Sequence, residues 1–243
     1  MNPMTSDAAV DWAGRLAAVR GRIAAAAVLS GRAETDITLI AVSKTQPWSS
    51  IAASAALGQR DFGENRIEEA VGKLAQPGAR DLLWHMIGHV QSRKAGDVAG
   101  AGFALVHSID TLKLAERISR AAEARGRCQP VLFECNVSGE ASKSGFMADD
   151  AGAWPALIDG WAVALTLPGI DVRGLMTMAP WGTDDDSARP VFDRLRRLCE
   201  TARARLGVAW PILSMGMTDD YVGAVREGAT HVRVGRALFG DRA

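Results

Sequence analysis

An alternation of short apolar runs and longer amphipathic segments dominates the sequence after residue 37. The apolar runs have the length of buried strands, whereas the segments between them place apolar residues at the three- and four-residue spacing of a helix. The predicted strands are 38–44, 60–63, 83–88, 103–107, 130–136, 170–175, 211–214 and 231–235. The predicted helices are 48–58, 65–75, 91–99, 110–126, 148–160, 187–206 and 218–227, with a short piece after 235. Eight strand–helix units predict an α/β fold, a closed parallel (β/α)8 (TIM) barrel, with an open doubly wound sheet as the alternative.

The length of the chain fits one such barrel. A (β/α)8 barrel typically takes about 250 residues, and this chain has 243. Before the alternation begins, one helical face is formed by Trp12, Leu16, Val19 and Ile23. The Thr-Ser-Asp sequence at 5–7 offers N-cap side chains for this helix, which should end near the Ser-Gly pair at 30–31. We therefore expect a single domain over 1–243, with an N-terminal helix in 1–31 and the barrel in 38–243.

The charge balance argues against nucleic acids and anionic membranes as partners. The 28 Lys and Arg residues equal the 28 Asp and Glu residues, so the formal net charge is zero. The three cysteines, Cys128, Cys135 and Cys199, form no CxxC pair, and we interpret them as reduced thiols of a cytoplasmic protein. The first residues lack the basic and apolar regions of a secretory signal.

Lys44 ends the first predicted strand, and Pro47 follows closely. In a barrel of this type the active site is built from loops at the carboxyl ends of the strands, which is where Lys44 would lie. A lysine there can anchor a carbonyl-bearing cofactor, because a desolvated amine loses its proton readily. The alternative is a solvated lysine that merely closes a strand, since most lysines lie at the protein surface.

The loops after the last two predicted strands have the features of a phosphate site. Ser214 supplies a hydroxyl, and Gly216 and Gly235 would let backbone N–H groups approach an anion. Helices that start after Met217 and after Gly235 would direct their positive ends at the same point. Barrels often bind phosphate with these loops, although each glycine could instead serve a tight turn.

Arg233 is predicted to point into the mouth of the barrel. Period-two alternation puts Val232 and Val234 on the outer face of the last strand and Arg233 on the inner one. The guanidinium must find a partner inside, because an unpaired buried charge is unstable. That partner could be a ligand acceptor atom or, structurally, a carboxylate such as Glu134. An amine, a phosphate site and a fixed donor together match pyridoxal 5′-phosphate, which carries an aldehyde, a phosphate and a ring acceptor.

Six segments carry specific motifs: residues 40–44, 62–65, 84–92, 106–110, 213–220 and 232–240. Together they resemble the pyridoxal phosphate homeostasis protein family, in order and over nearly the whole chain. The resemblance implies a single barrel similar to the N-terminal domain of bacterial alanine racemase. It also implies a covalently held cofactor and a role in vitamin B6 homeostasis, with no established catalytic reaction.

By that resemblance the cofactor-binding residues are Lys44, Asn65, Ser214, Arg233, Gly235 and Arg236. Lys44 would form a Schiff base with pyridoxal 5′-phosphate, and Arg233 would face the pyridine nitrogen. Ser214 and the backbone at 235–236 would hold the phosphate, and Asn65 would lie near the ring. Arg236 departs from the family, since many relatives carry a small hydroxyl residue there, but the backbone N–H survives this change.

The residues favour a cofactor-binding protein over an enzyme. Arg233 can only donate a hydrogen bond, so the ring nitrogen would stay unprotonated and the ring would be a weaker electron sink. An amino-acid racemase, the alternative, needs a second base, and the single tyrosine, Tyr221, is expected to pack in a helix. A metal-dependent hydrolase is disfavoured because no HExxH motif joins the histidines, which are His85, His89, His107 and His231. We expect no metal site, and a monomer whose partners are pyridoxal phosphate and the apo-enzymes that accept it.

Overall fold

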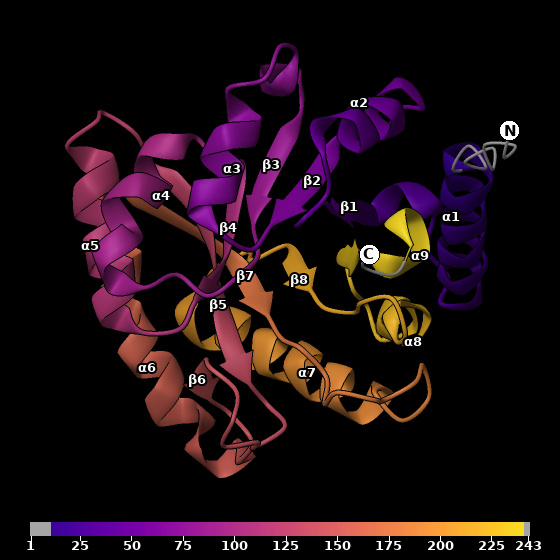
Figure 1. Cartoon of the computed structure of the whole chain (residues 1–243). Helices are drawn as coiled ribbons and strands as arrows, with labels where there is room; N and C mark the ends of the chain where they lie inside the picture. Colours follow the sequence, from indigo (N-terminus) through magenta and orange to yellow (C-terminus); the bar gives the residue numbers. More distant parts are fainter. Residues whose placement is uncertain (1–10, 241–243) are drawn as a thin grey trace, which may run out of the picture.

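The computed structural model describes residues 11–240, and eight of its strands form a closed parallel barrel (Figure 1). In ring order they are β1 (Thr38–Val42), β2 (Asp61–Glu64), β3 (Leu83–Met86), β4 (Leu105–Ile109), β5 (Gln129–Asn136), β7 (Ile170–Met176), β8 (Ile212–Ser214) and β9 (His231–Val234). Pairing of β4 with β5 and of β9 with β1 closes the ring. The predicted (β/α)8 barrel is confirmed, and the open doubly wound alternative is wrong.

Helices follow the strands and pack around the outside of the ring (Figure 1). They are α2 (Trp48–Ala56), α3 (Ile67–Leu74), α4 (Ala95–Ala101), α5 (Leu112–Glu123), α6 (Trp154–Leu165), α7 (Arg189–Leu206), α8 (Tyr221–Arg226) and α9 (Arg236–Phe239). The predicted N-terminal helix is α1 (Trp12–Leu29), which packs against α8 and α9 through a face that includes Leu16, Val19 and Ile23. Within 11–240, no helix has the length and apolarity needed to cross a membrane.

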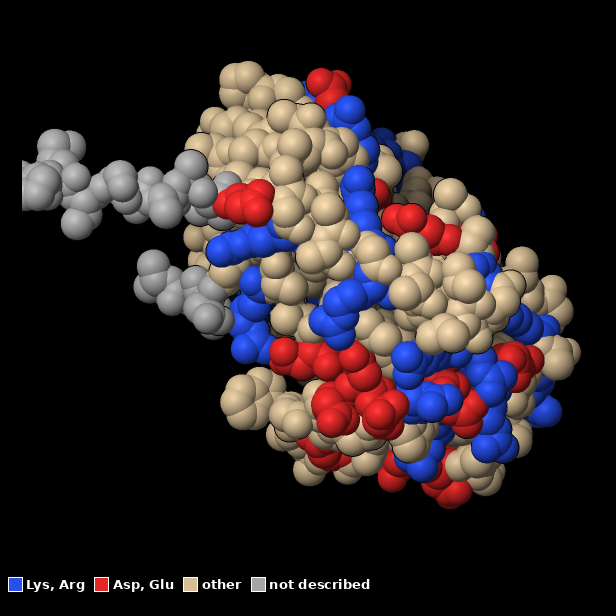
Figure 2. Space-filling model, turned by 90° about the vertical axis from the view of Figure 1, so that its right-hand side faces the viewer, with Lys and Arg blue, Asp and Glu red and all other residues tan. Residues whose placement is uncertain are grey.

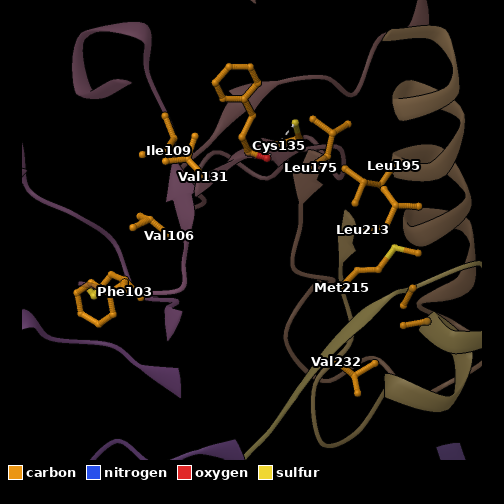
Figure 3. Close-up of a cluster of buried hydrophobic side chains, with 14 of the residues drawn as sticks. Phe103, Val106, Ile109, Val131, Cys135, Leu175, Leu195, Leu213, Met215 and Val232 are labelled. Carbon is orange, nitrogen blue, oxygen red and sulfur yellow. Dashed lines mark hydrogen bonds between the residues drawn. The ribbon is translucent and has the colours of Figure 1, made fainter. Parts of the chain in front are cut away.

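Period-two alternation divides the strand side chains between two layers. Figure 3 shows part of the outer layer, in which Val106, Leu213 and Val232 from the strands pack in one cluster with Leu195 of α7. Each fully buried Val or Leu contributes about 1.5–3 kcal/mol, so this layer supplies most of the hydrophobic stabilisation. A small separate cluster consists of Leu105, Leu132 and Met176. Buried polar side chains, among them His107, Ser214 and Arg233, also point inward, and Arg233 reaches the site.

The beginning of α1 differs from its prediction. The residues at 5–7, expected to cap this helix, lie outside the described range. Asp11 is the N-cap instead, and its Oδ1 accepts a hydrogen bond from the N–H of Gly14 at 2.8 Å. An Asp in this position stabilises the first turn by satisfying an otherwise unpaired backbone donor.

Three further segments also differ from their predictions. The helix predicted at 148–160 is α6, which begins at Trp154 because Asp150 caps a separate 3-10 turn in front of it. The two-residue strand β6 (Phe146–Met147), paired with the end of β5, is too short to show any periodicity in the sequence. The strand predicted at 103–107 is β4, which runs from Leu105 to Ile109 and includes Ser108, whose hydroxyl donates to the carbonyl oxygen of Gly88 at 2.6 Å. Polar residues thus continue a strand where the apolar run had ended.

Candidate functional site

A cavity of about 630 Å³ opens at the carboxyl ends of the strands. Five of the six predicted site residues line it, namely Lys44, Asn65, Arg233, Gly235 and Arg236. Trp181 from the loop after β7 and Thr218 from the loop after β8 also contribute to its wall. Strand ends that lie far apart in the sequence therefore converge on one cavity, as a barrel requires.

The backbone around Lys44 is held on both sides. Ser43 donates its hydroxyl to Oε1 of Glu64 at 2.6 Å, and the N–H of Thr45 donates to Oε1 of Glu69 at 2.6 Å. Thr45 has a φ of +64°, a left-handed conformation that β-branched residues rarely adopt. The half-buried Lys44 is thus presented from a strand end that tertiary contacts hold in a locally disfavoured conformation.

A buried lysine joins these contacts. Lys73 Nζ donates to Oε1 of Glu64 at 2.7 Å, to Oε1 of Glu69 at 2.6 Å and to the carbonyl oxygen of Ser43 at 2.7 Å. Glu64 is fully buried, and burial raises its pKa, against the opposing effect of hydrogen bonds from Lys73 and Ser43. We call Glu64, Glu69 and Lys73 the Lys73 network. It connects α3 and β2 to the residues on either side of Lys44.

Arg233 reaches the cavity from β9, on the inner face as predicted. Its Nη1 donates to Oγ of Ser214 at 2.6 Å, and its Nη2 donates to the carbonyl oxygen of Thr177 at 3.0 Å. These contacts replace the ion pair with Glu134 that the sequence offered as the structural alternative. Burial lowers the pKa of Arg233 to about 10, against the opposing effects of Asp220 and Glu134. The guanidinium is therefore a cation at neutral pH, and it has further N–H groups to donate.

Ser214 lies beneath the cavity rather than on its wall. It is fully buried, and its Oγ contacts both Nη1 of Arg233 and, at 2.8 Å, Nδ1 of His107. The hydroxyl that lines the cavity from the loop after β8 belongs to Thr218, which accepts a hydrogen bond from the N–H of Gly235 at 3.3 Å. Thr218 was not among the predicted residues, and its place in the loop that follows Ser214 was the available signal. Thr218 is therefore the hydroxyl that a molecule in the cavity could reach, whereas Ser214 contacts Arg233.

The two glycines of these loops have different environments. Gly216 has a φ of +94°, and a Cβ there would lie 2.5 Å from Cβ of Ala224 and 2.9 Å from Cα of Tyr221. Gly216 thus serves a turn with a positive φ that packs closely against α8, and a tight turn is the structural alternative considered from the sequence. A Cβ at Gly235 would meet only Val42, at an ordinary 3.5 Å. The room beside Gly235 therefore belongs to the cavity that this residue lines.

Arg236 and Asn65 contribute differently to the cavity wall. The side chain of Arg236 is exposed and forms an ion pair with Asp219, so it joins the loops after β8 and β9. Oδ1 of Asn65 is buried and has no hydrogen-bond partner in the described part of the chain. An orphaned buried acceptor costs about 1–3 kcal/mol, so a donor brought by a bound molecule would be stabilising there.

The face that carries α1 shows basic and acidic residues next to one another (Figure 2). Arg22 of α1 pairs with Asp185 at 3.2 Å, and Asp185 also accepts from the N–H of Gly223 on α8 at 3.0 Å. These contacts tie the loop after β7 to two helices. Neighbouring charges of opposite sign largely cancel, so this face does not favour the binding of a polyanion.

Comparisons with known proteins give this geometry a family. Residues 16–243 match the family model for the N-terminal domain of alanine racemase. Over 227 residues the chain is 42% identical to the pyridoxal phosphate homeostasis protein of Pseudomonas aeruginosa, with 93% of this chain and 94% of the relative covered. The chain belongs to the pyridoxal phosphate homeostasis protein family. The resemblance found in the sequence is confirmed.

Solved structures agree with membership of the homeostasis protein family. PipY of Synechococcus elongatus, in a structure with PLP bound, matches at 34% identity and a TM-score of 0.77, covering 95% of this chain and all of PipY (100%). Alanine racemase of Clostridium difficile matches at 15% identity and a TM-score of 0.69, covering 96% of this chain and 60% of the racemase. The second likeness shows the shared barrel fold alone.

The histidines and the tyrosine of this homeostasis family member lie away from the cavity wall. His85 and His107 are buried, and His89 pairs with Asp110 at 3.2 Å. Among residues 11–240, no three His, Cys, Asp or Glu side chains converge as a metal site. Tyr221 is buried on α8, as predicted, with the guanidinium of Arg22 5.0 Å from its ring centroid.

His231 should make the protein sensitive to acid. Burial, with His85 adding to the effect, lowers its pKa from 6.5 to about 4. The unfolded chain then takes up the proton first as pH falls, so stability that is fully present above pH 6.5 is lost toward pH 4. In the His231→Gln variant, the loss of unfolding free energy over this pH range should be smaller by about 1–3 kcal/mol.

Urea unfolding of both proteins at about pH 4.5 and about pH 7 measures this difference. Glu134, whose pKa burial raises to about 7, has the opposite sign, since its contribution is lost as pH rises. It is present in both proteins and cancels in the comparison. An equal loss of unfolding free energy between the two pH values in both proteins would contradict the role of His231.

Proposed function

We propose that this protein holds pyridoxal 5′-phosphate as a Schiff base on Lys44 and serves the homeostasis of this cofactor, without catalytic turnover of its own. The observation that carries the proposal is the convergence of Lys44, Arg233 and the Thr218–Gly235 pair on one cavity. The names of the curated relatives and the PLP-bound PipY structure support the same ligand. When bound, the cofactor supplies an aldehyde that reacts reversibly with amines.

The cavity fits the three parts of this ligand. Its volume of about 630 Å³ falls within the range of roughly 300–1,000 Å³ that small-molecule sites occupy. Lys44 lies two residues beyond the end of β1 and Arg233 lies on the neighbouring β9. Both line the one cavity, so one small molecule can contact both. The Thr218 hydroxyl and the backbone at 235–236 lie on the same wall and suit a phosphate. Lys44 would bind, Arg233 would orient the ring, and the two loops would hold the anion.

The cavity wall favours a carrier over a racemase. A protonated Arg233 leaves the ring nitrogen as an acceptor, so the ring withdraws electrons weakly and a substrate carbanion gains little stabilisation. Racemisation also needs a base on each face of the substrate, and the described wall offers no tyrosine or histidine as a partner for Lys44. Both observations concern the residues that a substrate would have to contact.

Recipients of the cofactor are the second part of the proposal. We infer that the protein works in the cytoplasm as a monomer and passes its cofactor to apo-enzymes. Trp181 stands on the cavity rim and is 99% exposed, so it is a side chain that such a recipient would contact.

Borohydride reduction of the protein after incubation with pyridoxal phosphate should fix one pyridoxyl phosphate group, and peptide mapping should place it on Lys44. Lys44→Ala should abolish the adduct completely. The matched control is Lys143→Ala, because Nζ of Lys143 donates at 3.1 Å to the carbonyl oxygen of Met178, a residue of the same wall. An adduct on another lysine, or no adduct, would contradict the proposal. Steady racemisation of L-alanine that requires Lys44 would establish the alternative function.

A further inference from the structure

A line of hydrogen-bonded side chains runs through the barrel interior from the cavity to the opposite end of the strands. It begins at Arg233, whose Nη1 lies 2.6 Å from Oγ of Ser214, and the same oxygen lies 2.8 Å from Nδ1 of His107. His107 Nε2 lies 3.0 Å from Nδ1 of His85, and His85 Nε2 lies 3.0 Å from Oδ1 of Asp61. Asp61 is the first residue of β2, so this end lies away from the cavity. We call these five residues the relay.

The inner members of the relay have little or no contact with water. Ser214 and His107 are 0% exposed, His85 3% and Arg233 4%, whereas the side chain of Asp61 is 21% exposed. An unpaired polar group in such surroundings costs about 1–3 kcal/mol. Both ring nitrogens of each relay histidine have a partner, so the relay satisfies its own buried groups.

The donors and acceptors of the relay fix the direction of every bond. A guanidinium only donates, so the Ser214 hydroxyl accepts from Arg233 and donates its proton to its other partner, Nδ1 of His107. Burial and the neighbouring histidines lower the pKa of His107, so its neutral ring carries the proton on Nε2 and donates it to Nδ1 of His85. Nε2 of His85 then donates to Asp61, because a carboxylate only accepts. The bonds run in one direction from a guanidinium to a carboxylate, and each proton has one acceptor.

We propose that Asp61, His85, His107 and Ser214 are positioning residues that hold the Arg233 guanidinium toward the ring nitrogen of the bound cofactor. The inference rests on the proposed function, because it assumes that the ring lies against Arg233. Ser214 and the carbonyl of Thr177 engage two donors of the guanidinium and restrict its rotation. A donor fixed in advance binds an acceptor more tightly, since less side-chain entropy is lost on binding. The relay should thus strengthen cofactor binding and tune the absorbance of the bound chromophore.

A double-mutant cycle separates positioning from a merely structural role. His107→Leu, Ser214→Ala and Arg233→Gln should each weaken binding of pyridoxal phosphate by about tenfold. All three should shift the absorbance maximum of the bound cofactor in the same direction. In the Arg233→Gln background, His107→Leu and Ser214→Ala should each add less than about a further twofold, because their effect acts through Arg233.

Asp61 gives a test of the relay from its far end. Asp61→Asn preserves the shape of the side chain and removes the charge, and Asp61 does not line the cavity. We expect binding about threefold weaker, with a smaller absorbance shift in the same direction. An Asp61→Asn protein with wild-type affinity and spectrum would show that the relay stops short of Asp61 and would overturn the proposal as stated.

His231→Leu is the matched control. The His231 ring centroid lies 6.3 Å from that of His107, but its Nδ1 contacts Oγ1 of Thr230 at 3.0 Å, outside the relay. Its cofactor affinity and spectrum should match the wild type. Additive losses in the cycle, or equal losses in His231→Leu, would overturn the proposal. If thermal unfolding shows that His107→Leu does not fold, the Ser214→Ala arm decides.

The proposed function and the role of the relay can be refuted separately. A wild-type protein without a borohydride-fixed adduct on Lys44 would refute the proposed function itself. A normal adduct on Lys44 together with an additive cycle would refute the relay alone.

Discussion

Lys73→Met should lower the free energy of unfolding by about 3–5 kcal/mol. The exchange leaves the fully buried Glu64 without its cation, and Oε2 of Glu64 already has no hydrogen-bond partner among the described residues. Breaking a buried ion pair from one side is strongly destabilising, because the remaining charge stays desolvated and uncompensated. Chemical denaturation at neutral pH measures the loss. The loss should shrink as pH falls, since burial raises the pKa of Glu64 and protonation removes the uncompensated charge.

Two further variants control for the removal of a lysine as such. Lys94 pairs with Glu68 at 2.8 Å, but their side chains are 32% and 64% exposed. Lys94→Met should therefore change stability by less than about 0.5 kcal/mol. Adding Glu64→Gln to Lys73→Met removes the uncompensated carboxylate charge and should recover a large part of the lost unfolding free energy. A similar loss in Lys94→Met, or no recovery in the double variant, would contradict this account.

The Lys73 network also links stability to the cofactor site. Lys73 contacts the carbonyl oxygen of Ser43, and Glu69 contacts the N–H of Thr45, so the network holds both neighbours of Lys44. Without it the left-handed conformation of Thr45 would lose a supporting contact. The amine would then be presented less uniformly, which slows a reaction that depends on position. The folded fraction of Lys73→Met should form its adduct on Lys44 more slowly than the wild type.

Periodicity was sufficient to predict the barrel and the direction of Arg233. Both follow from short-range patterns, since a strand exposes alternate residues to each layer. The Lys73 network could not be found in this way. Glu69 and Lys73 have the four-residue spacing of an ordinary exposed helix pair. The burial of Lys73 depends on Glu64, which comes from β2, and on the packing of α3 against that strand.

The contacts of the polar side chains inside the barrel could not be predicted from periodicity either. Ser214 ends β8 and Thr218 lies in the loop that follows. The sequence does not show that the first hydroxyl contacts Arg233 and the second lines the cavity. His85 and His107 are 22 residues apart and lie on adjacent strands, where their ring nitrogens meet at 3.0 Å. Such contacts depend on strand register, which a single sequence specifies only through the whole fold.

Gly235→Val should weaken the binding of pyridoxal phosphate by about 10- to 100-fold, because overpacking of a fitted site costs about 1–3 kcal/mol. The melting temperature should stay near that of the wild type. Residue 235 has a φ of −113°, which any residue can adopt, and the protein's own atoms leave a Cβ in ordinary contact there. The added side chain would instead enter the cavity. Equilibrium titration with pyridoxal phosphate and thermal unfolding measure the two effects.

Gly216→Ala should have the opposite outcome and serves as the control. Its φ of +94° strains any side chain, and the new Cβ would overlap Ala224 and the backbone of Tyr221. Strain and overpacking together should remove about 2–4 kcal/mol of stability. The folded fraction should keep its affinity for pyridoxal phosphate, because Gly216 is not part of the cavity wall. In the sequence the two glycines have the same interpretation, so equal losses of binding in both variants would contradict their separate roles.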